Sequence, residues 1–104
     1  MEIKLNQDEW AGVSAEDRKK IQEIISSHFK GTQVAPHAGA PKATDFLAQR
    51  QIQAFNFKNP LCTAACGVAE AAAVAACSVL SGGTAIAVCV AAAHAAGDYC
   101  RSRC

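Results

Sequence analysis

The sequence predicts an all-α protein that ends in an antiparallel helical hairpin, with arms at about 60–80 and 84–103. Three observations predict this class. They are the spacing of the six cysteines, the alanine-rich sequence between them, and the pair Gly82-Gly83 at their centre. Alanine is the strongest helix former, and a glycine pair is a strong turn signal. We therefore expect two long helices that reverse direction at the diglycine.

The cysteines follow one another at steps of 4, 11, 12, 11 and 4 residues, a series that is the same in both directions. Steps of 4 and 11 return to nearly the same face of a helix, because each residue turns it by about 100°. Two antiparallel helices would set one cysteine stripe against the other. The symmetry favours a nested pairing, Cys62–Cys104, Cys66–Cys100 and Cys77–Cys89. A single membrane-spanning helix across the uncharged residues 71–93 is the alternative.

The N-terminal residues alternate between apolar and polar types around Ile3 and Leu5. This pattern is that of a short strand, which could dock on a partner protein. Trp10 is the only tryptophan and is a candidate anchor for recognition, with local packing as the alternative.

A helix is predicted at about 15–30, with Ser14 as its N-cap and Gly31 at its C-terminal end. Its apolar residues recur at the spacing of one helical face. With Trp10, this stripe is the expected docking surface for a maturation enzyme or exporter: Ile21, Ile24, Ile25 and Phe29.

Residues 32–43 are predicted to be a flexible linker, because prolines, glycine and small residues give no periodicity. A second short amphipathic helix is expected at about 45–56, with Thr44 as its cap. We therefore divide the chain into a leader or recognition segment, 1–57, and a stapled hairpin, 58–104.

The hairpin needs small side chains where its arms meet. Helix axes usually lie about 8–10 Å apart, whereas disulfide-bonded Cα atoms lie within about 4.4–6.8 Å. The expected seam is composed of Ala69, Ala73, Ala93, Ala96 and Gly97. Gly82 is expected to end the first arm, and Thr84 to cap the second.

The outer face of the hairpin is almost wholly apolar. Leu61, Val68 and Val79 lie opposite the cysteine stripe of the first arm. A helix pair of this kind must be buried against residues 44–57 of the same chain, another copy of the chain or a membrane. An arm of about 20 residues is about as long as a bilayer's hydrocarbon core is thick.

Charge and cysteine are separated along the chain, since the charged residues concentrate before residue 60 and every cysteine follows it. An even number of clustered cysteines favours an oxidising destination. The polar N-terminus lacks the apolar region of a Sec signal peptide. We therefore expect synthesis in the cytoplasm and secretion of the C-terminal part by another route. The alternative is that the cysteines stay reduced in the cytosol. The net charge of +1 disfavours nucleic acid as a partner.

The sequence contains no recognised catalytic or phosphate-binding motif, so we predict neither an enzyme nor a cofactor. Glu70 and His94 are predicted to face different directions, as solvent-facing polar residues. A thiolate zinc site is a minor alternative that would use Cys62, Cys66, Cys100 and Cys104.

The pattern Cys-x3-Cys … Cys-x3-Cys, at the outer four cysteines, resembles the α-hairpinin peptides, which are helical hairpins with nested disulfides and antimicrobial, inhibitory or channel-blocking activity. The layout of charged leader and apolar core also resembles bacteriocin precursors, in particular the glycocins. The chain departs from these groups in its long arms, its inner pair Cys77–Cys89 and the lack of a double-glycine site near residue 60. Ser81 and Thr84 at the turn are candidates for modification.

The resemblance implies a ribosomal precursor whose hairpin is a secreted antimicrobial peptide that acts on a target membrane or membrane protein. The alternative class is a non-enzymatic interaction module that stays full length, with 14–57 packed on the hairpin.

Overall fold

The computed structural model describes residues 2–50 and 60–103. Within these ranges the chain forms two strands, five α-helices and a short 3₁₀ helix. In chain order they are β1 (Glu2–Asn6), α1 (Gln7–Ala11), α2 (Ala15–His28), β2 (Gln33–His37), α3 (Ala43–Arg50), α4 (Pro60–Ala76), η1 (Cys77–Val79) and α5 (Gly83–Ser102).

The prediction of an all-α fold is wrong in one respect, because β1 and β2 form a two-stranded parallel sheet. Ile3 lies opposite Val34 in the register, and both side chains are buried. The alternation at Ile3 and Leu5 does form a strand, but its partner lies within the same chain. Five-residue strands carry little periodicity, and a parallel partner thirty residues away leaves no local signal.

The predicted linker at 32–43 contains β2 and is therefore not a structureless connection. The Gln22 side chain of α2 donates from Nε2 to the Val34 carbonyl at 3.0 Å, and its Oε1 accepts from the Val34 N–H at 3.1 Å. This pair of bonds occupies backbone groups of β2 as a neighbouring strand would. A glutamine on a helix thus fixes a segment whose own composition does not predict a strand.

Helix α2 begins and ends close to the predicted limits. The Ser14 hydroxyl accepts from the Asp17 N–H at 3.2 Å, and Gly31 has a positive φ of 77° beyond the last turn. Helix α3 begins at Ala43, whose N–H donates to Glu9 Oε1 at 2.7 Å, so a distant carboxylate caps it. The remainder of the predicted helix at 45–56 lies outside the described residues.

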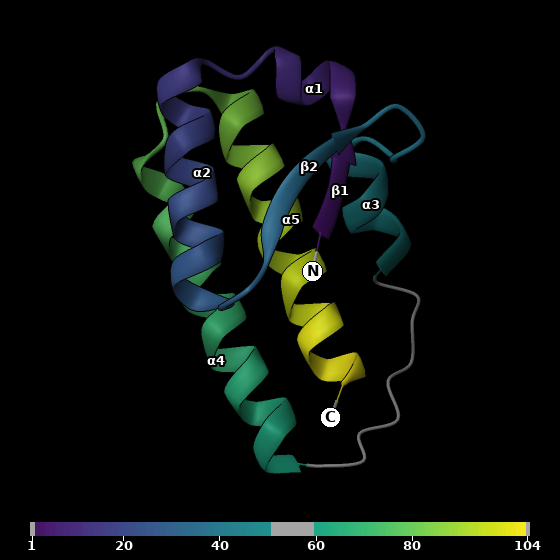
Figure 1. Ribbon diagram of the computed structural model, residues 1–104, viewed down its shortest axis with the longest axis vertical. Helices are drawn as coiled ribbons and strands as arrows, with labels where there is room; N and C mark the ends of the chain where they lie inside the picture. The colour runs from purple at the N-terminus through teal and green to yellow at the C-terminus, as the bar shows by residue number, and fades with distance from the viewer. Residues whose placement is uncertain (1, 51–59, 104) are drawn as a thin grey trace.

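Helices α4 and α5 run antiparallel, and η1 with residues 80–82 joins them (Figure 1). The first arm ends at Ala76, earlier than predicted, and continues as the 3₁₀ turn. Gly82 is the N-cap of α5 in an extended conformation, and Thr84 lies inside the helix. Among the described residues only Gly31 has a positive φ, so the diglycine turn does not use the left-handed region.

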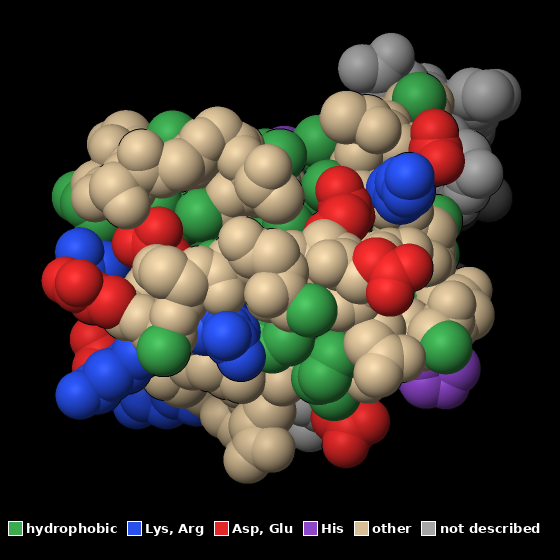
Figure 2. All heavy atoms as spheres, turned by 90° about the horizontal axis from the view of Figure 1, so that it is seen from above, with side chains coloured by type: hydrophobic (Ala, Val, Ile, Leu, Met, Phe, Trp, Pro, Cys, Tyr) green, Lys and Arg blue, Asp and Glu red, His purple; other side chains and the backbone are tan. Residues whose placement is uncertain are grey.

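Helix α5 occupies the middle of the molecule, with α2 and α4 on one side, α3 on the other and the sheet across it (Figure 1). One hydrophobic cluster joins the two segments that the sequence separates, because Ile3, Trp10 and Ile21 share it with Ala73 and Val88. Seen from above, acidic and basic side chains lie interspersed on the surface (Figure 2).

Candidate functional site

The candidate site is the disulfide-bonded hairpin of α4 and α5. Cys66 is bonded to Cys100 and Cys77 to Cys89, with Cα atoms 5.7 Å apart in each pair. Both pairs belong to the predicted nested set. The outer pair, Cys62–Cys104, stays a prediction because Cys104 lies outside the described residues. Since Cys66 and Cys100 are bonded to each other, their sulfurs are not the thiolate ligands that a zinc site would need.

Small residues permit this close approach, as the sequence predicts. Ala73 and Ala93 are fully buried, Ala96 and Gly97 are buried, and Ala69 packs against the same cluster. Any larger side chain at these positions would hold the two helices farther apart than a disulfide allows.

A buried ionic cluster lies in the same seam and corrects the prediction for Glu70 and His94. Glu70 is 8% exposed and accepts from His94 Nδ1 at 2.6 Å. Its other oxygen accepts from Arg101 at 2.5 Å, and Arg101 also contacts Asp98. The Cβ that Gly97 lacks would lie 2.7 Å from Glu70 Cδ, so the carboxylate rests directly on the glycine.

The sequence did contain a signal for this cluster. The mirror relation about Gly83 that pairs the cysteines also places Glu70 across from Ala96, beside Gly97. The angular position of a residue on its own helix does not reveal this relation, because Glu70 and His94 lie on different helices that face each other.

Burial raises the pKa of Glu70, but the hydrogen bonds from Arg101 and His94 and their charges outweigh it, so the pKa lies below its usual value of 4.5. The hydrogen bond to Glu70 is the main reason that the pKa of Arg101 is raised. Glu70 is therefore ionised at neutral pH, with both oxygens engaged. This arrangement links α4 to α5 and leaves Glu70 poorly placed to act as a general base.

The outer face of α4 is apolar and exposed. Leu61 is 84% exposed, Val68 71% and Val79 65%. Between them the exposed residues of α4 and η1 are small and uncharged: Ala64, Ala65, Ala71, Ala72, Ala75 and Ser78. The stretch Pro60–Val79 has a mean hydropathy of 1.6, and only 22% of its most apolar window is buried. It is long and apolar enough to span a bilayer, a criterion of length and composition alone. We call the exposed residues from Leu61 to Val79 the α4 face.

The residues proposed for leader recognition lie in the protein core. Ile21 and Ile25 are fully buried, Trp10 and Phe29 are buried, and Ile24 is partly buried against the same cluster. Their burial leaves little of these side chains accessible in the folded chain, and their role in leader recognition stays a prediction.

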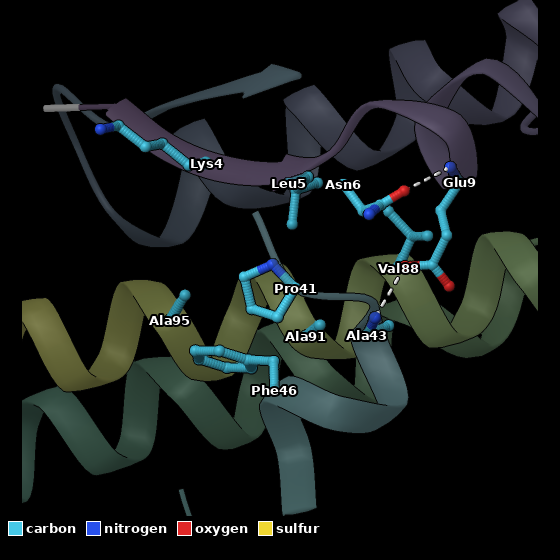
Figure 3. Close-up of a pocket in the computed structure, with 10 residues that line it drawn as sticks. All are labelled: Lys4, Leu5, Asn6, Glu9, Pro41, Ala43, Phe46, Val88, Ala91 and Ala95. Atoms are coloured by element: carbon cyan, nitrogen blue, oxygen red, sulfur yellow. Dashed lines mark hydrogen bonds between the residues drawn. The ribbon is translucent and has the colours of Figure 1, made fainter. Parts of the chain in front are cut away.

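A small cavity lies where β1, α3 and α5 meet (Figure 3). Its volume of about 20 Å³ suffices for about one water molecule. Around it, Asn6 Nδ2 donates to the Ala40 carbonyl at 3.0 Å, and Glu9 caps α3. These contacts hold the loop before α3, and the cavity is too small for an organic ligand.

A larger groove of about 470 Å³ lies between the C-terminal end of α2 and the open end of the hairpin. Residues from both segments line it: His28, Phe29, Lys30, Thr32, Cys62, Ala65, Cys66, Ala69, Ala96, Tyr99, Cys100 and Arg103. The described residues that line it are mostly apolar, and the charged ones among them are cationic.

No protein-family model, curated protein or solved structure matches this chain. Across residues 2–50 and 60–103, no three histidine, cysteine or acidic side chains are grouped as metal ligands.

Proposed function

We propose that this chain is the precursor of a secreted antimicrobial peptide, and that its hairpin acts on a target membrane or a membrane protein. The exposed α4 face supports the proposal most directly. The face is apolar along the whole helix. Two disulfides join the arms of the hairpin, so the helix that carries the face is linked covalently to α5. Contiguous exposed apolar surfaces can mark sites of membrane or protein binding.

The N-terminal segment would then serve as a cover for the other arm. Strand β1 and helices α1, α2 and α3 all contact α5. Removing them would expose the apolar face of α5, including Val88 and Ala92, in addition to the α4 face. A hairpin that is apolar on both arms suits an environment of lipid better than water.

Mass spectrometry of material secreted by the natural producer tests the proposal. We expect a species that begins near residue 58–62 and is lighter by six hydrogens than the reduced peptide. Detection of only the full-length chain would contradict precursor processing. A matched pair of hairpin peptides tests the action, since Val68→Glu should abolish dye release from vesicles and Val68→Leu should retain it.

The second candidate is an interaction module that stays full length. The shared hydrophobic core favours it, because Ile21 and Ile25 of α2 pack in the same cluster as Ala73 and Val88 of the hairpin. Cleavage near residue 58 would separate the two halves of that core. The same mass spectrum distinguishes the two candidates.

A further inference from the structure

We propose that the groove between α2 and the hairpin binds the headgroup of an anionic phospholipid in a bilayer, with the α4 face against the acyl chains. This inference concerns the intact chain, because Lys30 belongs to the segment 1–57 and Arg103 belongs to the hairpin. It does not depend on release of the hairpin.

The positively charged side chains that line the groove favour an anionic headgroup. Lys30 and Arg103 are both exposed and line it together with His28, and no acidic residue is among the described residues that line it. Arg103 lies over the Tyr99 ring, 5.7 Å from its centroid, which limits the positions of the guanidinium. Two cations at one mouth suit a phosphate or phosphodiester group.

The apolar part of the lining favours a lipid over a free phosphate. Ala65, Ala69 and Ala96 line the groove, and Phe29 and Tyr99 contribute aromatic side chains. At about 470 Å³ the groove has the size of an ordinary ligand site. It therefore has room for a headgroup and the beginning of its chains.

The groove is continuous with the α4 face, which identifies a bilayer as the source of the lipid. Ala65 lines the groove and is also exposed, with Leu61 one turn before it and Val68 nearly one turn after it. Residues at this spacing occupy one side of a helix. A lipid headgroup in the groove would thus place the α4 face at the depth of the acyl chains.

The test is sedimentation of the oxidised full-length protein with vesicles of phosphatidylglycerol and phosphatidylcholine, compared with phosphatidylcholine alone, in about 0.1 M salt. We expect binding to the anionic vesicles only. Each cation near an anionic surface contributes about fivefold in affinity, so Lys30→Gln with Arg103→Gln should weaken binding about 25-fold. The control, Lys19→Gln with Lys42→Gln, removes two exposed cations outside the groove and should weaken binding less than fivefold.

Equal binding by the groove variant and the wild type would overturn the proposal, as would equal binding to neutral vesicles. The proposal would also be overturned if inorganic phosphate shifted the amide resonances of Lys30 and Arg103 as strongly as short-chain phosphatidylglycerol, because the groove would then be a phosphate site without lipid selectivity. Circular dichroism of each variant excludes loss of the fold as the cause. Since no step involves cleavage or dye release, failure here leaves the precursor proposal intact.

Discussion

Helices α4 and α5 are two arms of similar composition in very different surroundings. Both are rich in alanine and poor in charge, yet α5 has eight buried residues and α4 has three. Helix α5 contacts β1, α1, α2, α3 and α4, whereas α4 packs mainly on α2 and α5. Composition thus makes both segments helical, and the N-terminal elements determine which of them becomes the core.

The largest test of this difference uses one residue type on both arms. Val88 of α5 is 1% exposed, and Val68 of α4 is 71% exposed. Val88→Asp should destabilise the protein by about 3–5 kcal/mol or unfold it, because it buries an unpaired charge. Val68→Asp should change stability by less than about 1 kcal/mol. Urea unfolding followed by circular dichroism measures both, and equal effects would show that the two arms are equally buried.

The disulfides test how the exposed arm is held to the buried one. Replacing Cys66 and Cys100 by alanine opens a loop with a sequence separation of 34 residues, and the loop-entropy model predicts that the free energy of unfolding falls by about 4 kcal/mol. Replacing Cys77 and Cys89, which are separated by 12 residues, should lower the free energy of unfolding by about 3 kcal/mol.

Amide hydrogen exchange shows which helix is destabilised when a disulfide is removed. Without Cys66–Cys100, amide protection should fall more in the first half of α4 than in α5, because α5 keeps its other neighbours. Equal loss in both helices would contradict the view of α4 as the peripheral arm.

Gly67 of α4 and Gly97 of α5 provide a comparison in which the expected effects are smaller and opposite in sign. A Cβ at Gly97 of α5 would meet Glu70 Cδ at 2.7 Å, whereas a Cβ at Gly67 of α4 would meet nothing within 4 Å. Gly97→Ala should therefore destabilise the protein by about 1–3 kcal/mol through overpacking. Gly67→Ala should stabilise it by about 0.5–1 kcal/mol through helix propensity. Thermal unfolding checks the two signs, and stabilisation by both would mean that Glu70 moves freely.

The pH dependence of the ionic cluster is the most subtle test. Because the pKa of Glu70 is lowered in the folded chain, its contribution is present above the ordinary value of 4.5 and is lost as pH falls through the folded pKa. Glu70→Gln should be less stable than the wild type at pH 7, and the gap should narrow below pH 4.5. Chemical unfolding at several pH values measures this gap. A constant gap would show that the charge of Glu70 does not contribute.

The long, locally encoded features could be predicted from the sequence. Ser14 and Gly31 mark the limits of α2 through local hydrogen bonding and backbone conformation, and the cysteine intervals predict the two disulfides of the described residues. Strand β2 could not be predicted because Gln22 and β1, both distant in sequence, complete its hydrogen bonds. The contact of Glu70 with His94 does not follow from the angular position of each residue on its own helix, because it depends on how α4 and α5 face each other.

The sequence by itself determined that two alanine-rich helices meet closely, because only small side chains let disulfides form between helices. Only the tertiary structure decided that α5 is enclosed while α4 keeps an exposed apolar face. The reason is that burial depends on which elements cover a helix, and those elements here are short segments far away in the chain.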